Sequence, residues 1–281
     1  MALADSVPGV SGGTIAFLLG FYDKFILSLD HLVTGTKEER KEAILFLIKI
    51  GIGWVVGFIL AALAITQIFE SHIYIVSSVF LGFIMFAIPI IILEEKDVLK
   101  GKYINLIFTA IGIAVVVALS VFNPASDVDI QNLTLGSGIY VFVAGAIAIT
   151  AMVLPGISGS TLLLIFGLYV PIMSAIKEFL HFDFSYFPVL FIFGLGVITG
   201  IVSTIKLIKM CLEKYRSQTT YAIIGLMIGS LYSITQGPTT LKVPQNPMDI
   251  HTFSFVFFIV GGVIIFGLQK LKMISEKKSK E

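Results

Sequence analysis

Hydrophobic residues in this chain are gathered into long runs. A helix that crosses the hydrocarbon core of a membrane needs about 20 predominantly apolar residues. Six uninterrupted runs approach or exceed that length, and we expect each to be a membrane-spanning helix: residues 43–69, 74–93, 103–122, 187–211, 219–235 and 253–268. The pattern therefore predicts an all-α polytopic membrane protein.

Two further apolar runs are interrupted by similar motifs. The run from the N-terminus to residue 29 contains Pro8-Gly9-Val10-Ser11-Gly12-Gly13-Thr14, and the run from 139 to 176 contains Pro155-Gly156-Ile157-Ser158-Gly159-Ser160-Thr161. Proline lacks a backbone donor and glycine relaxes the backbone, so together they end a helix. We call these segments the first loop motif (residues 8–14) and the second loop motif (residues 155–161).

The two halves of the chain carry the same features in the same order. Aligning the loop motifs also pairs Gly20 with Gly167 and Tyr22 with Tyr169. Further along, a second set of glycines matches in order: Gly51, Gly53, Gly57 and Gly82 with Gly194, Gly196, Gly200 and Gly225. Such ordered matches indicate a duplication. It divides one integrated membrane domain into repeats at residues 1–125 and 126–281, each with one interrupted segment and three spans.

The basic residues of the loops predict how the repeats are oriented. If each interrupted segment is re-entrant, the loops rich in Lys and Arg share one side: residues 37–41, 94–102, 206–217 and 270–281. If those segments crossed the membrane instead, the basic residues of the second half would fall largely outside. The re-entrant interpretation therefore agrees with the positive-inside rule. Three spans in each repeat then invert the second repeat relative to the first and place the C-terminus in the cytoplasm.

Composition agrees with a membrane protein and argues against other classes. Of the 281 residues, 57% are hydrophobic and only 13% are charged, and the mean hydropathy is +0.99. The net charge of +1 argues against a nucleic-acid partner. No pair of histidines has the spacing of metal ligands, so we expect neither a metal nor another cofactor.

The loop motifs are the candidate substrate site. Non-helical backbone at membrane depth must be buried in protein or line a wet cavity, and paired breaks in a duplicated transporter mark its binding site. Bare glycine amides, hydroxyl donors and the positive ends of the following helices favour an anion, phosphate above all. The predicted phosphate-binding residues are Ser11, Gly12, Gly13, Thr14, Ser158, Gly159, Ser160 and Thr161. The plainer alternative is a pair of packing kinks in which Ser and Thr satisfy freed carbonyl groups.

Charged residues near the first loop motif have two interpretations each. Asp5 is a candidate carrier of a coupling proton or an organiser of loop amides, and equally a helix cap or an interfacial acid. Lys24 is a candidate for attracting a phosphate headgroup, although snorkelling to the interface is the commoner role of such a lysine. Lys49 lies one turn inside an apolar run and has the same ambiguity.

The motifs resemble those of the bacterial polyprenyl-phosphate transporter family. The resemblance rests on Ala4–Thr14, on Gly20-Phe21-Tyr22-Asp23-Lys24 and on Leu154–Ser160, and it covers nearly the whole chain. It implies a flippase of the bacterial cytoplasmic membrane that returns undecaprenyl phosphate, the carrier lipid of cell-wall synthesis, from the outer to the inner leaflet. Whether a proton or a sodium ion drives the transport stays open. The resemblance also implies a short apolar segment before the first loop motif, matching residues 140–153, whereas this chain starts almost at the motif.

Two other classes of function compete with this one. A transporter or channel for a small soluble anion would use the same loops, but only a lipid needs a lateral opening between helices. A membrane enzyme acting on a lipid phosphate would need a nucleophile or metal cluster beside an acid or base. Because no His or Arg lies near either loop motif, we expect no enzyme activity.

Overall fold

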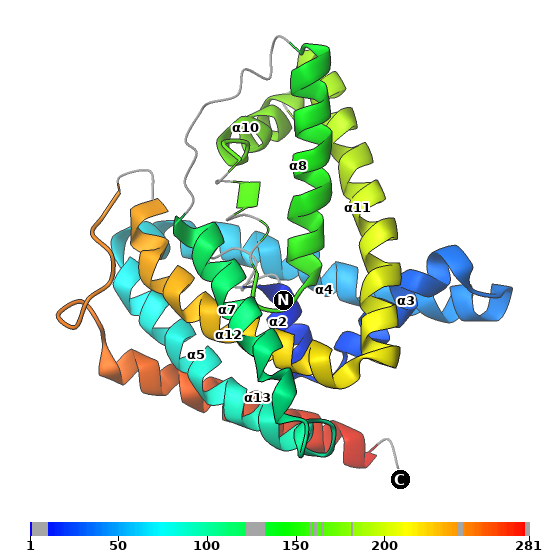
Figure 1. Ribbon diagram of the computed structural model, residues 1–281. Helices are drawn as coiled ribbons and strands as arrows, with labels where there is room; N and C mark the ends of the chain where they lie inside the picture. The colour runs from blue at the N-terminus through cyan, green and yellow to red at the C-terminus, as the bar shows by residue number, and fades with distance from the viewer. Residues whose placement is uncertain are drawn as a thin grey trace.

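The computed structural model of the protein describes residues 1, 11–121, 133–157, 159, 162–163, 166–180, 182–240 and 244–278 (Figure 1). Within these ranges every regular element is a helix, and no strand is present. The all-α class predicted from the hydrophobic pattern is therefore confirmed.

The helices follow one another with short connections. In chain order the α-helices are α2 (Gly12–Leu18), α3 (Tyr22–Thr34), α4 (Lys37–Ser71), α5 (Ile73–Glu94), α6 (Lys96–Leu99), α7 (Leu106–Val121), α8 (Leu135–Val153), α10 (Tyr169–Leu180), α11 (Phe187–Lys214), α12 (Arg216–Gln236) and α13 (Phe255–Lys278). Short 3-10 helices at Tyr103–Asn105 and Phe184–Tyr186 lead into α7 and α11, and another follows α12 at Gly237–Thr240.

Four of the described helices are long and apolar enough to cross a membrane: Ile73–Glu94, Tyr103–Val121, Leu135–Val153 and Phe184–Lys214. A fifth candidate is the bent pair α2 and α3, whose axes meet at 115°. The predicted runs at 74–93, 103–122 and 187–211 correspond to three of these helices. The runs at 219–235 and 253–268 form α12 and α13; α12 is not among these candidate spans, and α13 contributes a shorter apolar helix, Phe255–Lys270.

Helix α12 differs from the other predicted spans because it is the most enclosed of them. Its first turns are polar, and buried residues recur along its length, including Ser217, Thr220, Met227 and Ser230. Helix α12 packs against α7 and α5, so its polar side chains face protein. A helix surrounded by other helices does not need the uniformly apolar surface that lipid demands, which explains its lower hydropathy.

The same turn occurs at matching positions in the two halves of the chain. Gly20 separates α2 from α3 and has a φ of 72°, and its predicted counterpart Gly167 precedes α10 with a φ of 64°. Glycine reaches this left-handed conformation without the steric penalty that other residues meet. Two glycines predicted as equivalents from the sequence therefore make the same local break.

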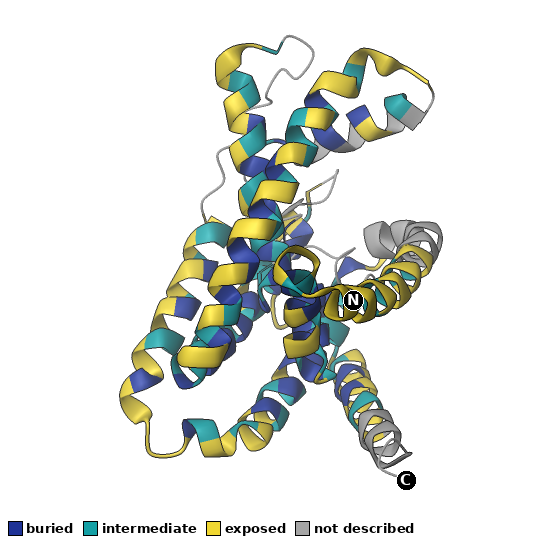
Figure 2. Ribbon diagram, turned by 90° about the vertical axis from the view of Figure 1, so that its right-hand side faces the viewer, coloured by how far each residue is buried: buried dark blue, intermediate teal, exposed yellow. Residues whose placement is uncertain are grey.

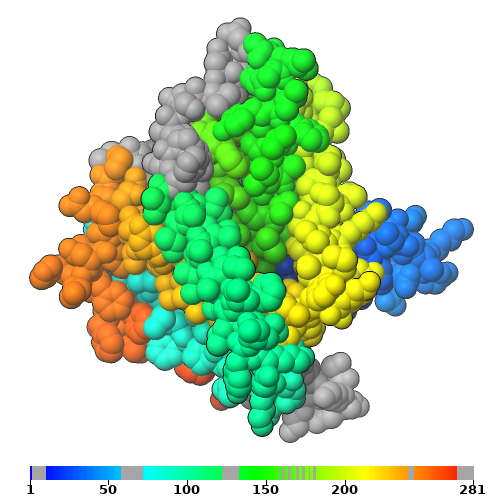
Figure 3. Space-filling view, viewed as in Figure 1, coloured from blue at the N-terminus to red at the C-terminus, as the bar shows by residue number. Residues whose placement is uncertain are grey.

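Three pairs of the helices that the structure describes run parallel. Thr150 in α8 shares a hydrogen bond with Thr204 in α11, and nearer the start of both helices Phe142 lies against Gly196. Because α8 and α11 run in one direction, residues 154–186 must return from the end of α8 to the start of α11. Figure 3 shows α8 and α11 side by side on one face of the molecule.

The other two parallel pairs each join the two halves of the chain. For α5 and α13, Ser254 N just before α13 donates to Ser78 Oγ over 3.0 Å, and at the other end Gln269 Nε2 donates to Glu94 Oε1 over 2.7 Å. In α7 and α12, Asn105 Nδ2 donates to Ser217 Oγ over 2.9 Å near the start of both helices. The glycine register predicts that α5 corresponds to α12, so pairing α5 with α13 mirrors pairing α12 with α7.

Three of the four basic segments lie at one end of this bundle. Arg216, which begins α12, bonds to Glu95 after α5, and the contact of Gln269 with Glu94 brings α13 to the same end. At the opposite end, Tyr74 Oη donates to Asn246 O over 2.9 Å. The loops at 94–102 and 206–217 and the end of α13 therefore lie together, away from the segment that contains Asn246.

Apolar side chains cover much of the outer surface. Figure 2 shows exposed residues along the outer faces of the helices and buried residues where helices meet. The exposed ones include large side chains such as Ile104, Leu135 and Val263, at 85%, 84% and 65% exposure. Such a surface suits lipid and would be unfavourable in water. The chain is accordingly a multi-pass membrane protein.

Candidate functional site

The first loop motif contacts the start of the second. Ser11 is 2% exposed, and its Oγ donates to the carbonyl oxygen of Leu154 over 3.1 Å while accepting from Gly13 N over the same distance. Thr14 is 1% exposed, and its Oγ1 accepts from Gly156 N over 2.8 Å. Two breaks more than 140 residues apart in sequence therefore meet through buried polar groups.

Glycine makes this contact close. A Cβ at Gly13 would lie 2.7 Å from the carbonyl oxygen of Val153, at the end of α8. Gly156 has a φ of 90°, and a Cβ there would lie 2.6 Å from the backbone of Leu226 in α12. Because these neighbours are backbone atoms, a side chain at either position would push the two motifs apart or push the second motif off α12.

The structure describes five of the eight predicted phosphate-binding residues. Ser11, Gly12, Gly13 and Thr14 are all buried at the start of α2, and Gly159 is buried against α8, where its Cβ would lie 2.8 Å from Ala148 O. Ser158, Ser160 and Thr161 lie outside the described residues, as does Asp5. The phosphate site itself therefore stays a prediction.

Tyr22 is a polar group beside the motifs that the sequence did not single out as functional. Its side chain is 1% exposed, and its hydroxyl has no hydrogen-bond partner among the described residues. It packs in a cluster with Ala16 of α2, Val153 of α8 and Ile205 of α11. Buried hydroxyl groups in folded proteins are usually hydrogen-bonded, so the Tyr22 hydroxyl is a polar group that a ligand could bind. Sequence alone showed only that Tyr22 recurs as Tyr169.

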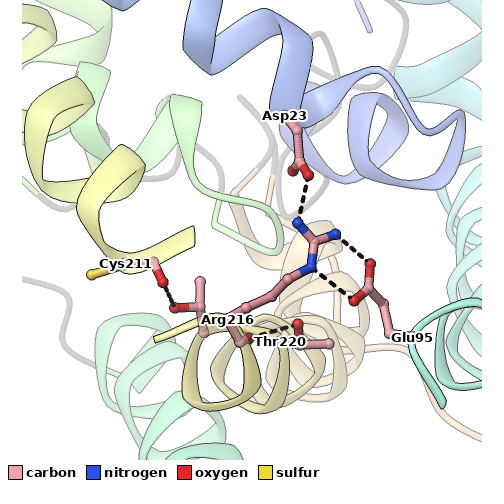
Figure 4. Close-up of polar contacts among 6 residues, drawn as sticks. Asp23, Glu95, Cys211, Arg216 and Thr220 are labelled. Atoms are coloured by element: carbon pink, nitrogen blue, oxygen red, sulfur yellow. Dashed lines mark hydrogen bonds and ion pairs between the residues drawn. The ribbon is translucent and has the colours of Figure 1, made fainter. Parts of the chain in front are cut away.

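An arginine holds the start of α3 to the rest of the bundle (Figure 4). Arg216 Nη1 lies 2.7 Å from Asp23 Oδ2, and Arg216 Nη2 lies 2.6 Å from Glu95 Oε1. Hydrogen bonds to Glu95 and then to Asp23 raise the pKa of Arg216 above its ordinary value, so the guanidinium stays charged. This contact joins the start of α3 to the end of α5 and the start of α12.

A second ion pair fixes the far part of α3. Lys209 Nζ of α11 lies 2.6 Å from Asp30 Oδ2, and Asp30 also accepts from Thr34 Oγ1 over 2.9 Å. The Asp30 side chain is only 5% exposed, so losing Lys209 would leave a nearly buried carboxylate without its cation. Both ion pairs of α3 therefore bind it to the second half of the chain.

Lys24, the predicted headgroup attractor, does not face the loop motifs. Its Nζ lies 4.9 Å from the centre of the Phe46 ring in α4, and its side chain lines a pocket between α3 and α4. Asp23 and Lys24 are adjacent on α3 and therefore point in different directions, one toward Arg216 and the other toward α4.

The chemistry of the described site is that of hydrogen-bond donation. Ser11 Oγ, Gly13 N and Gly156 N all donate within the contact between the motifs. Among the described residues no group of His, Cys, Asp and Glu is arranged to hold a metal ion. The described part of the site offers donors for an anion.

The fold and the paired motifs define a multi-pass helical membrane protein with a polar contact in its interior. The model of a family described as undecaprenyl phosphate translocase-like matches residues 1–252. This chain belongs to that family.

Two relatives are similar over nearly their whole length. The polyprenyl-phosphate transporter of Staphylococcus aureus (strain NCTC 8325 / PS 47) is 32% identical over 284 residues, which cover 98% of this chain and 95% of the relative. The polyprenyl-phosphate transporter of Vibrio cholerae serotype O1 (strain ATCC 39315 / El Tor Inaba N16961) is 32% identical over 303 residues, which cover 96% and 93%. Both relatives are named as transporters and neither as an enzyme. No solved structure matches the chain.

Proposed function

We propose that this protein is a flippase that returns undecaprenyl phosphate from the outer to the inner leaflet of the bacterial cytoplasmic membrane. The substrate class follows from the family and from relatives named as polyprenyl-phosphate transporters. The headgroup is an anion that needs hydrogen-bond donors when it leaves water, and the polyprenyl tail can remain in lipid throughout.

The observation that carries this proposal is the contact between the two loop motifs. A phosphate oxygen can replace the carbonyl oxygen of Leu154 as the acceptor for Ser11 and can replace Thr14 Oγ1 as the acceptor for Gly156 N. Hydrogen bonds to a charged group are worth about 1.5–3 kcal/mol each, against about 0.5–1.5 kcal/mol for the neutral bonds replaced. The motifs hold each other while no phosphate is bound and exchange those bonds for the headgroup.

Tyr22 belongs to the same site in this account. Its hydroxyl is buried without a partner among the described residues, and it packs beside Val153, next to Leu154. An approaching phosphate would supply the missing acceptor.

Re-entrant motifs in inverted repeats would give the headgroup a route from one side of the membrane to the other. The parallel course of α8 and α11 supports a second motif that enters and leaves on one side. The matched turns at Gly20 and Gly167 and the mirrored pairs α5–α13 and α12–α7 support a duplication. Loops that enter from opposite faces would share one phosphate near the membrane midplane and alternate which side is open.

The cytoplasmic side is the end that carries the basic loops. The contacts of Glu94 and Glu95 with α13 and α12 bring three of the four basic segments to one end, and we assign that end to the cytoplasm by the positive-inside rule. The C-terminus is then cytoplasmic. Cysteine labelling that places residues 123–136 and 206–217 on the same side would reject the inverted arrangement.

Asp5 remains the candidate for coupling transport to a proton or a sodium ion. If Asp5 carries a proton, Asp5→Asn should abolish the response of transport to a pH gradient while lipid binding persists. If it orders loop amides, binding itself should weaken. Equal transport rates and pH profiles for Asp5→Asn and wild type would remove Asp5 from the mechanism.

Affinity for the lipid tests the loop site. Polyprenyl phosphate binding in nanodiscs should weaken about tenfold in Ser11→Ala, the loss expected for one hydrogen bond to a charged group. Tyr22→Phe should weaken binding without lowering stability, because it removes an unpaired hydroxyl. The matched control is Ser203→Ala, which removes a hydroxyl bonded only to the Thr199 and Gly200 carbonyl groups of its own helix α11. Unchanged affinity in both loop-site variants would make the motifs packing kinks. Equal displacement by inorganic phosphate would favour a small-anion transporter.

A further inference from the structure

A pocket of about 420 Å³ lies between α3 and α4, outside the contact of the loop motifs. Its walls include Lys24, Ser28 and His31 from α3 and Glu42, Phe46 and Lys49 from α4. The two helices form an antiparallel hairpin that projects from the main bundle in Figures 1 and 3. The pocket therefore lies in a part of the molecule that the other helices cover only partly.

The charges in this pocket are separated along its length. Glu39 and Glu42 belong to the first turns of α4, near the tip of the hairpin, and His31 lies at the matching end of α3. Lys49 lies ten residues after Glu39, which is about 15 Å along a helix at 1.5 Å per residue. Lys24 is near the start of α3 and packs on Phe46, so it shares the inner end with Lys49. One end is mixed in charge and the other is basic.

No described carboxylate pairs with the basic end. Asp23 is held by Arg216, and Glu39 accepts from Thr36 N over 2.8 Å and from Thr36 Oγ1 over 2.9 Å. The ion pairs of the described residues involve neither Lys24 nor Lys49. Lys49 stands within an apolar run, where an ammonium group without a counter-ion is unfavourable. Glu42 also lines the pocket, but the ion pairs of the described residues do not include it, so neither lysine of the inner end is bound to a described carboxylate.

We propose that the inner end of the α3–α4 pocket binds the phosphate monoester headgroup of a polyprenyl lipid, as a staging site in the cytoplasmic leaflet. Lys24 and Lys49 supply the charge, and Ser28 supplies a hydroxyl donor on the same wall. Exposed apolar side chains beside it, Leu27, Leu45 and Ile48, offer a surface for the tail. This inference rests on the proposed function and adds a second site to it.

The position of the pocket connects it to the loop site. Helix α2 begins at Gly12 in the first loop motif and ends at Leu18, and Lys24 follows in the first turn of α3. One short helix therefore separates the first loop motif from Lys24 along the chain, although Lys24 itself points toward α4. The lysines then compete with the loop donors for the phosphate and favour its release into the leaflet.

Tryptophan quenching tests the site directly. The single tryptophan, Trp54, lies five residues beyond Lys49 in α4. Polyprenyl phosphate with a nitroxide in its first isoprene units should quench Trp54 in nanodiscs. Lys24→Gln/Lys49→Gln should raise the lipid concentration for half-maximal quenching about tenfold, since two charged contacts are lost. Lys37→Gln/Lys41→Gln removes the same charge from α4 outside the pocket and should leave quenching unchanged. Lys24→Arg/Lys49→Arg should restore it.

The outcomes separate the two proposals. If wild type neither binds nor transports the lipid, the proposed function fails. If wild type does both and the pocket variant quenches like its control, the staging site is wrong and the proposed function stands. If millimolar inorganic phosphate restores Trp54 fluorescence in wild type as effectively as unlabelled lipid, the pocket takes free phosphate and the lipid proposal is overturned.

Discussion

Helices α4 and α11 carry the same glycine spacing, but at the second glycine of the pattern α11 is packed against another helix and α4 is open among the described residues. Gly196 of α11 lies directly against the carbonyl oxygen of Phe142 in α8, with no room for a side chain. Its predicted counterpart Gly53 in α4 has no such neighbour within 4 Å of a built Cβ. Gly51 and its counterpart Gly194 likewise have no neighbour within 4 Å of a built Cβ. The two helices therefore have the same open environment at the first glycine. At the second glycine they differ, because α8 packs against α11 there.

This difference shows what a small-residue pattern does and does not specify. Such a pattern permits close approach of two helices, but the approach occurs only where a partner is present. In the second half, α8 precedes the second loop motif and supplies that partner. Along α4 the side chains around Gly53 are exposed and apolar, including Ile52 and Val56 at 61% and 51% exposure. An apolar face of this kind is stable against lipid tails without any partner.

The largest effect should come from adding one methyl group to each of these helices. Gly196→Ala should destabilise the protein by about 1–3 kcal/mol, because the new Cβ forces α8 and α11 apart. Gly53→Ala should be neutral or stabilising by up to about 1 kcal/mol, because alanine favours the helix and meets no neighbour. Denaturant unfolding in detergent measures both. Equal destabilisation would mean that α4 is covered as α11 is.

Substituting the glycines of the two loop motifs that pack against α8 should give the next largest effect. A Cβ at Gly13 or at Gly159 would lie within 2.8 Å of a carbonyl oxygen of α8. Gly13→Ala and Gly159→Ala should each destabilise by about 1–2 kcal/mol and lower lipid flipping several-fold. Gly51→Ala, with no neighbour within 4 Å, is the control. Wild-type stability and flipping in either loop variant would show that α8 does not constrain that motif.

The two loop serines should have comparable effects on affinity. If both motifs serve one phosphate, Ser11→Ala and Ser158→Ala should each weaken polyprenyl phosphate binding by about 1.5 kcal/mol, near tenfold. Isothermal titration in detergent measures both, and the double variant tests whether their effects are coupled. An effect confined to Ser11 would mean that the two halves differ at the loops as they do at the helices.

The smallest effect is expected at the half-exposed arginine between the halves. Arg216→Gln should cost less than about 1 kcal/mol, and high salt should shrink the difference, because exposed ion pairs are weak and screened. Lys209→Gln should cost more, since Asp30 is nearly buried. Thermal unfolding at low and high salt compares the two. A larger, salt-independent loss in Arg216→Gln would assign it a structural role beyond the ion pair.

The sequence predicted the individual helices of this fold better than it predicted which helices pack against each other. Long apolar runs predicted helices such as α5 and α7, because hydropathy is a local property. Polar side chains that face other helices lower the hydropathy of α12. Helix α12 is therefore not among the candidate spans that length and apolar composition identify. The parallel pairing of α8 with α11 depends on packing between residues 54 apart, and no periodicity within either helix encodes it.

The sequence predicted the loop motifs of the candidate site but not the residues that surround them. Recurrence of the motif selected Ser11 and Thr14, which the structure places against Leu154 and Gly156. Tyr22 was visible only as a repeat partner of Tyr169, since the missing partner of its hydroxyl is a three-dimensional property. The link of Arg216 to Asp23 spans 193 residues and has no local signal.

Headgroup flipping in liposomes tests the central claim most directly. Purified protein is reconstituted with polyprenyl phosphate labelled at the headgroup, and the label exposed on the outer leaflet is followed with time. We predict that wild type moves the label between leaflets, that Ser11→Ala slows this movement about tenfold, and that Ser203→Ala matches wild type. Liposomes with wild-type protein that flip the lipid no faster than empty liposomes would contradict the account.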